Sequence, residues 1–236
     1  MKSRTALLLG ASGLVGGHCL RLLLEDEAYG KVRALVRRPL SVEHPRLEQQ
    51  VIDFDQLDAA AALITGDDVF CCLGTTMKQA RSRAAFRRVD FTYPHEIAKR
   101  ALNNGAEQFL IITSLGAHPR SRFYYSRIKG VIEEAIRALD YRSVQIFRPS
   151  LLLGDRHPSR RGEKLGMSLG RACSFLMTGP MRKYRPIAAE TVASAMLAIA
   201  REQPKGVNIF PSHHIQAIHD GKPSPPAPPA GPPGLI

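Results

Sequence analysis

Short apolar runs recur along this chain, and most are followed by a stretch in which apolar residues return at helical spacing. The runs cover residues 4–10, 31–38, 47–54, 67–74, 106–116, 142–149 and 206–210. The run at 106–116, AEQFLIITSLG, holds too many consecutive apolar residues for a sheet with one face in water. Strands of this kind that alternate with helices indicate an α/β fold with a parallel sheet covered on both faces.

The spacing predicts helices at 14–25, about 55–64, 80–104, 122–139, 163–177 and 189–202. The alternation weakens after Pro149. We therefore expect a single domain over 1–212, with a small substrate-side region within about 151–190. Residues 213–236 are expected to be a disordered or extended tail, which is rich in Pro and Gly over 221–236. A polyproline ligand for a partner domain is the alternative for this tail.

Three glycines, Gly10, Gly13 and Gly16, follow the first apolar run and open the first helical stretch. In this context the first permits a tight turn, the second lets the backbone approach a diphosphate, and the third lets the helix pack on the sheet. The N–H groups and dipole of the helix then favour an anion. The alternative is a glycine-rich loop without a ligand. The motif predicts a doubly wound, Rossmann-type fold that binds a dinucleotide through residues of the turn, namely Gly10, Ser12, Gly13, Leu14, Val15 and Gly16.

Two arginines, Arg37 and Arg38, end the second strand, where a site that prefers NAD usually offers a carboxylate to the ribose 2′-hydroxyl. Two guanidinium groups instead suit a 2′-phosphate, through charge and bidentate hydrogen bonds. The residues therefore favour NADP(H) over NAD(H), with a pair of solvated surface arginines as the alternative.

The ends of the next two strands fall at the same edge of the expected sheet. Asp53 and Phe54 end the third strand and are expected to contact adenine. The fourth strand ends in small residues that would allow close approach to a ribose, although they also fit a plain turn: Leu73, Gly74, Thr75 and Thr76.

Tyr125 and Lys129 are four residues apart on one face of an expected helix. A phenol has a pKa of about 10 and is a poor acid or base at neutral pH. A nearby ammonium lowers that pKa and makes proton transfer accessible near pH 7. Ser114 ends the preceding strand, where its hydroxyl can polarise a carbonyl in the same cleft. The sequence thus predicts a catalytic group of Ser114, Tyr125 and Lys129.

These motifs resemble those of the short-chain dehydrogenase/reductase superfamily, of the atypical or extended kind. The stretches LGTTMKQARSRAAFRRVDF, ITSLGA, YSRIKGVIEEAI and IFRPSLLLGDR are similar to the Tat-interacting-protein-like oxidoreductases and their bacterial relatives, often grouped with NAD-dependent epimerase/dehydratases. The likeness covers roughly residues 3 to 212. The region after Pro149 is short for a sugar-nucleotide pocket. This weakens the prediction of epimerase activity more than the prediction of cofactor binding.

The resemblance implies roles for further residues. Tyr125 would be the acid/base, Lys129 would contact the nicotinamide ribose, and Ser114 would orient the substrate. The stretch from Arg148 through Pro149, Ser150 and Leu151 would pass near the nicotinamide. Asp90 falls where many extended members carry a polar residue that faces the site.

The formal net charge is +12, and residues 118–186 alone hold 15 Lys or Arg against 5 Asp or Glu. Such a surface can attract nucleic acid, acidic lipid or a phosphorylated ligand. With 6% aromatic residues, no Trp and no nucleic-acid motif, nucleic-acid binding is not predicted. A basic face that helps to attract an anionic cofactor is the simpler interpretation. No apolar run reaches the roughly 18 residues of a membrane span.

The cysteines and the C-terminal histidines suggest no metal site. Cys19, Cys71, Cys72 and Cys173 lack metal-ligand spacing and are interpreted as buried thiols in a reducing, cytoplasmic setting. No acid or cysteine is spaced to complete a first shell with His213, His214 and His219, so a solvated cluster is expected.

The sequence as a whole predicts an NADP(H)-dependent oxidoreductase that acts on a small carbonyl or alcohol, with Tyr125 as acid/base. The alternative is a redox-sensing regulator or protein-interaction module that binds NADP(H) without turnover. The identity of the substrate is not predicted, and a homodimer and a protein partner are both left open.

Overall fold

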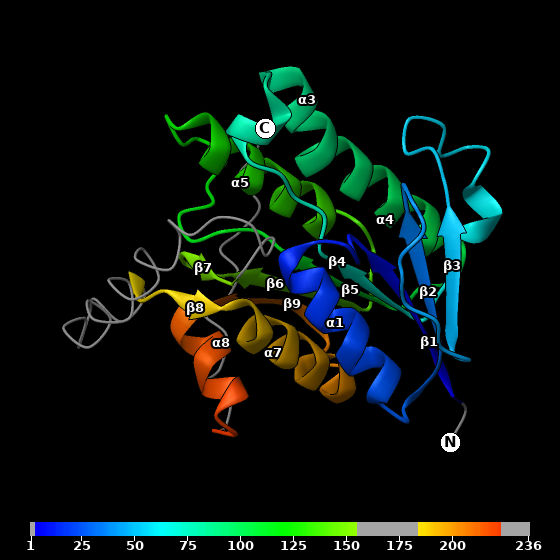
Figure 1. The fold of residues 1–236 in the computed structure, drawn as a ribbon. Coiled ribbons are helices and arrows are strands. Elements are labelled where there is room, and N and C mark those ends of the chain that lie inside the picture. Colours follow the sequence, from blue (N-terminus) through cyan, green and yellow to red (C-terminus); the bar gives the residue numbers. More distant parts are fainter. Residues whose placement is uncertain (1–2, 155–183, 223–236) are drawn as a thin grey trace.

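The computed structural model describes residues 3–154 and 184–222. Seven parallel strands form one sheet in the order β3-β2-β1-β4-β5-β6-β9 (Figure 1). Their bounds are β1 Arg4–Leu9, β2 Tyr29–Val36, β3 Leu47–Val51, β4 Asp68–Cys71, β5 Gln108–Ile112, β6 Ser143–Arg148 and β9 Gly206–Pro211. A separate parallel pair joins β7, Leu152–Leu153, to β8, Ile187–Ala188. The predicted Rossmann-type parallel sheet is confirmed.

Helices cover both faces of this sheet, as the uniformly apolar strands require. The α-helices are α1 Leu14–Glu25, α2 Met77–Ala80, α3 Arg83–Arg87, α4 Tyr93–Asn103, α5 Tyr124–Arg137, α7 Ala189–Glu202 and α8 Ser212–His219. Successive residues of β1 serve opposite faces: Leu8 packs in one buried cluster, while Leu7 and Leu9 pack in the other. Both sides of the sheet are therefore core.

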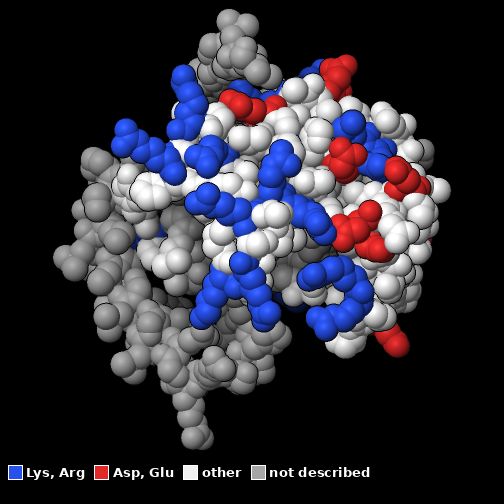
Figure 2. All heavy atoms as spheres, turned by 90° about the horizontal axis from the view of Figure 1, so that it is seen from above, with Lys and Arg blue, Asp and Glu red and all other residues white. Residues whose placement is uncertain are grey.

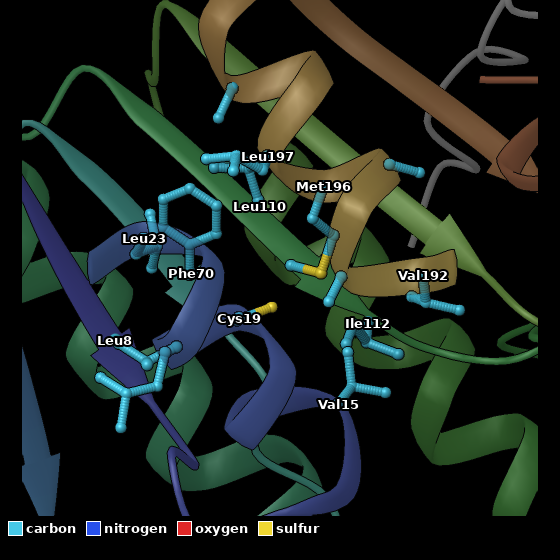
Figure 3. Close-up of a cluster of buried hydrophobic side chains, with 14 of the residues drawn as sticks. Leu8, Val15, Cys19, Leu23, Phe70, Leu110, Ile112, Val192, Met196 and Leu197 are labelled. Carbon is cyan, nitrogen blue, oxygen red and sulfur yellow. The ribbon is translucent and has the colours of Figure 1, made fainter. Parts of the chain in front are cut away.

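The cluster under α1 and α7 holds the glycine turn in place (Figure 3). In it, Val15, Cys19 and Leu23 of α1 meet Val192 and Met196 of α7 over the strands. The opposite cluster is built from α4 and α5. Since α1 packs on the sheet through its whole length, its N-terminus is fixed against the end of β1.

The long helix expected at 80–104 is interrupted in the structure. Arg81 ends α2 in the left-handed region, with φ of 63°. A π-helical segment at Arg88–Thr92 then joins α3 to α4. The short helix expected at about 55–64 is wrong: only a single 3-10 turn forms there, at Ala61–Leu63.

The expected tail from residue 213 is also wrong at its start. Residues 213–219 belong to α8, whose Ile215 is fully buried and Ile218 nearly so. Two isoleucines three residues apart give this short helix an apolar face that packs on the core. The helix predicted at 163–177 and the remainder of the tail, 223–236, lie outside the described residues.

Candidate functional site

The glycine turn lies at the point where the strand order reverses, between β1 and β4. Gly10 has φ of +79°, and a Cβ on it would lie 2.6 Å from the carbonyl oxygen of Cys72. A Cβ on Gly16 would lie 2.0 Å from the Gly10 carbonyl oxygen. Backbone therefore packs on backbone at both positions, and only glycine fits. Crevices at such reversals are where open α/β sheets bind their ligands.

The start of α1 suits a diphosphate. Gly13 is the N-cap and contributes no side-chain cap, its first turn carries no acid, and Ser12 and Gly13 are exposed. The first N–H groups of a helix have no partner within it, and they carry the positive end of the helix dipole. Leu14 and Val15 contribute such groups. The turn thus fits the phosphates of a dinucleotide without competition from a carboxylate.

Arg37 and Arg38 follow β2 and are exposed at the same edge of the sheet. Asp53, after β3, is exposed and accepts hydrogen bonds within its own loop, from the Asp55 N–H at 2.9 Å and the Gln56 amide at 3.2 Å. The Phe54 ring is instead buried, 5.5 Å from the ring of Tyr93. Of the predicted pair, only Asp53 presents its side chain to solvent.

Lys129 and Asp90 form a buried ion pair next to Gly74, just after β4. The Lys129 Nζ lies 2.7 Å from Asp90 Oδ1, with 7% and 0% of the two side chains exposed. The Thr75 N–H donates to Asp90 Oδ2 at 2.9 Å. A Cβ on Gly74 would lie 3.5 Å from the Asp90 carboxylate and 3.6 Å from the Lys129 ammonium. The end of β4 therefore lies directly on the ion pair.

The ion pair keeps Lys129 charged. Burial alone would lower the pKa of this ammonium, but the nearby Asp90 carboxylate, with further contributions from Tyr125 and Cys71, raises it above its usual value. Asp90 reaches Lys129 from the π-helical segment, and such segments are frequent at functional sites. The resemblance placed Asp90 at the site, and the structure brings it there.

Tyr125 and Ser114 are the other two residues of the predicted group. Tyr125 opens α5 one turn before Lys129, is 38% exposed, and has its ring 5.6 Å from that of Phe86. Ser114 follows β5, and its buried Oγ makes no hydrogen bond within the described part of the chain. A buried hydroxyl without a protein partner is uncommon, and at the carboxyl end of a central strand it suits a ligand oxygen.

Three of the residues that the resemblance places near the nicotinamide differ in burial and in their hydrogen bonds. Pro149 is buried, and its carbonyl oxygen accepts from the Leu115 N–H at 2.8 Å. The Ser150 hydroxyl donates to the carbonyl of Arg185 and lies 3.0 Å from the Ser212 Oγ. Leu151 is 68% exposed.

Two of the residues expected near a ribose have other surroundings. Thr76, after β4, caps α2 by accepting a hydrogen bond from the Gln79 N–H at 3.2 Å, and Leu73 is half-buried.

Sequence reasoning missed a buried network behind the site. Glu133 accepts a hydrogen bond from the Thr113 hydroxyl and forms a two-point ion pair with Arg148, whose Nε lies 3.0 Å from Glu133 Oε1. Glu133 thereby ties α5 to the ends of β5 and β6. The signal was available, because Glu133 follows Lys129 by four residues and so shares its helix face.

The described cysteines are free thiols: Cys19 and Cys71 are buried, and Cys72 is half-buried with its Sγ 3.8 Å from that of Cys19. Cys173 lies outside the described residues. Within the described ranges no group of His, Cys, Asp and Glu could hold a metal ion, and no helix is long and apolar enough to cross a membrane.

The sequence of this chain is similar to those of known proteins. A family model described as NAD(P)H-binding matches residues 10–145. The rat protein HTATIP2 is 38% identical over 169 residues, which are 70% of this chain and 69% of that protein. FMP52-1 of Scheffersomyces stipitis is 34% identical over 204 residues, which are 84% of this chain and 88% of that protein.

Solved structures show the same fold at low sequence identity. The Bordetella bronchiseptica enzyme WbmH, in complex with NAD+, has a TM-score of 0.67 at 16% identity, covering 96% of this chain and 84% of its own. MoeE5, in complex with UDP-glucose and NAD, has a TM-score of 0.65 at 17% identity, covering 93% and 83%.

The expected cytoplasmic location is contradicted by these comparisons. FMP52 of Saccharomyces cerevisiae, 34% identical over 70% of this chain and 74% of its own length, is named a mitochondrial protein, as is FMP52-1. The expectation rested on cysteine usage, and reduced thiols in a protein core do not specify a compartment.

Proposed function

We propose that this chain, which belongs to the NAD(P)H-binding family within the short-chain dehydrogenase/reductase superfamily, is an NADP(H)-dependent oxidoreductase for a small carbonyl compound or alcohol. The observation that carries the proposal is the buried Lys129–Asp90 pair under Gly74, one helical turn from the exposed Tyr125. A buried ion pair is costly unless both charges are well placed. Here it lies at the end of β4, which is the neighbour of β1 and its glycine turn.

In this proposal the bound nicotinamide supplies the hydride chemistry. Tyr125 gives a proton to the carbonyl oxygen during reduction and takes one from the alcohol during oxidation. The Ser114 hydroxyl donates a hydrogen bond to the same oxygen and orients the substrate. Lys129 holds the ribose hydroxyls and a positive charge beside the phenol, and Asp90 fixes the direction of its ammonium. Arg37 and Arg38 bind the 2′-phosphate.

Cofactor choice is tested by titrating the protein with NADPH and with NADH and following nucleotide fluorescence. We expect NADPH to bind at least about tenfold more tightly, because hydrogen bonds to a charged group contribute about 1.5–3 kcal/mol. The double variant Arg37→Ala/Arg38→Ala should lose this preference. Arg142→Ala, which removes one arginine at the opposite edge of the sheet, should keep it. Equal affinity for both nucleotides would refute the NADP(H) assignment.

Turnover is tested with a panel of aldehydes and ketones and the variant Tyr125→Phe. Loss of the acid/base should lower kcat by about 10² to 10⁴-fold while NADPH affinity stays within a factor of about three. Tyr141→Phe removes the same hydroxyl from a tyrosine that bonds the Ala98 carbonyl before β6, so it should keep its activity. Nucleotide binding without any turnover would favour the alternative, an NADP(H)-sensing regulator.

A further inference from the structure

Two segments carry positive charge and no acidic residue, and the second of them contains Tyr125. Residues 75–89 contain five Lys or Arg and residues 113–132 contain four, and neither segment contains Asp or Glu. Seven of these side chains are exposed. Arg87 lies over the Phe91 ring and Arg88 pairs with Asp55. The other five form what we call the cationic rim: Lys78, Arg81, Arg83, Arg120 and Arg122. Seen from the α3 side in Figure 2, Lys and Arg spread over the middle of the described surface, while most Asp and Glu gather toward one side.

The two segments of the rim are packed together next to Tyr125. The Tyr124 hydroxyl donates to the Arg83 carbonyl oxygen at 2.9 Å. The guanidinium groups of Arg83 and Arg127 lie 5.2 Å and 5.5 Å from the centre of the Tyr124 ring. The Phe86 ring contacts the rings of both Tyr124 and Tyr125. The rim is therefore built on the side chains that hold the proposed acid/base.

The rim charges are not neutralised within the described part of the chain. Arg88 and Arg100, on the same stretch of helix, pair with Asp55 and Asp58, but none of the five rim side chains pairs with a described acid. Arg81 also adopts a left-handed backbone, with φ of 63°, which costs free energy in a non-glycine residue. Five cations on two packed segments, without counter-charges among the described residues, favour an anionic ligand.

The phosphates of the cofactor belong to a different part of the edge. The glycine turn follows β1 and the arginines expected at the 2′-phosphate follow β2, whereas the rim follows β4 and β5. In the strand order, β2 and β4 lie on opposite sides of β1. The rim is therefore available for a different anion, on the side of the sheet where Tyr125 and Ser114 lie.

We propose that the substrate carries an anionic oxygen group, carboxylate or phosphate, which the cationic rim binds while the carbonyl lies at Tyr125 and Ser114. The inference rests on the proposed function and specifies its substrate class. Arginine forks bind either anion through charge-assisted hydrogen bonds, and the anion then fixes which carbon faces the nicotinamide.

The test compares three probes that share one ring: benzoate, phenyl phosphate and benzyl alcohol. Their dissociation constants are measured by ligand-observed NMR for the protein with and without NADPH, and NADPH binding is measured separately. We expect both anions to bind at least about tenfold more tightly than the alcohol, with an advantage that falls as salt rises. The order of the two anions then distinguishes a carboxylate substrate from a phosphate ester.

The double variant Arg81→Ala/Arg122→Ala should lose most of the anion advantage and leave binding of NADPH and benzyl alcohol unchanged. Lys205→Ala, which removes an exposed charge before β9 at the opposite edge, is the matched control and should retain it. Anion binding that is unchanged in the double variant, or no stronger than that of the alcohol, overturns the proposal. Failure of NADPH binding with an intact rim effect overturns the proposed function alone.

Discussion

Gly16 and Gly17 are neighbours in α1, yet the structure gives them opposite tolerances. A Cβ on Gly16 would lie 2.0 Å from the Gly10 carbonyl oxygen, whereas a Cβ on Gly17 would lie 3.6 Å from the Ala11 carbonyl oxygen. The first contact is a clash of the added Cβ with the backbone of the glycine turn. The second is ordinary van der Waals contact at an exposed position.

Gly16→Ala should therefore lower the free energy of unfolding by about 3 kcal/mol, because neither backbone can move without shifting α1 on the sheet. It should also weaken NADPH binding. Gly17→Ala should raise stability by about 0.5 kcal/mol, since alanine favours helix more than glycine does. Urea unfolding and nucleotide titration measure both effects. Equal tolerance at the two positions would mean that α1 does not pack as described.

The Lys129–Asp90 pair allows a sharper test, because each charge depends on the other. The pKa of Lys129 is raised in the folded protein, so the stability linked to the Lys129 charge is fully present below about pH 10.5 and is lost as the pH rises through the higher folded pKa. Asp90→Asn keeps an oxygen for the Thr75 N–H but leaves a buried ammonium unpaired. It should cost about 3–5 kcal/mol at pH 7.

The matching double variant is Asp90→Asn/Lys129→Met. It removes both charges and should recover most of the stability that the single variant loses. Urea unfolding of the four proteins of this cycle at pH 7 gives the coupling energy. Additive effects of the two substitutions would show that the two groups do not interact in solution.

At the scale of elements, the sequence predicted the strands well and the segment between β4 and β5 poorly. Apolar runs mark strands because the sheet is buried on both faces, and that signal is local. The π-helical segment at Arg88–Thr92 has no such signal, since its extra residue per turn is set by packing and not by spacing. Asp90 could therefore be assigned to the site by resemblance but not by helical periodicity.

The pairing of β2 with β3 at the edge of the sheet depends on Glu48. Hydrogen bonds from Arg33 hold the pKa of this carboxyl at about 2 against the opposing effect of burial, and Lys31 adds an ion pair at 3.2 Å. A depressed pKa means stability that is present above the ordinary pKa of 4.5 and is lost as the pH falls toward 2.

Glu48→Gln should lower the unfolding free energy by about 1 kcal/mol at pH 7, a value discounted for the partial exposure of the pair. The difference from the wild type should shrink as the pH falls from 4.5 toward 2, because the unfolded carboxyl then binds a proton that the folded carboxylate does not. Urea unfolding at several pH values measures this. Glu43→Gln, an exposed glutamate before β3, is the control and should show no such trend.

At the scale of the whole molecule, composition gave a wrong prediction at the C-terminal end, because a short helix and a Pro- and Gly-rich segment were treated as one tail. The Pro- and Gly-rich end of the chain suggested a tail from residue 213, but 213–219 form most of α8. The three histidines at 213, 214 and 219 indicated a solvated segment, and the two isoleucines between them, which pack inward, were not recognised as a helical apolar face. A helix of eight residues is marginal alone, so its stability comes from the sheet and α7 on which it packs.

Ile215→Ala tests whether α8 belongs to the cooperative unit. Its side chain is fully buried among core residues under β6, β9 and α7, and its loss should cost about 2–4 kcal/mol. Gln216→Ala changes the next residue, which is exposed and bonds only Asp220, and should cost less than about 0.5 kcal/mol. One urea transition with an unchanged slope is expected for both variants. If Ile215→Ala unfolds like the wild type, α8 is an appendage and the domain ends at β9, because a core residue cannot be removed from a two-state fold without lowering its midpoint.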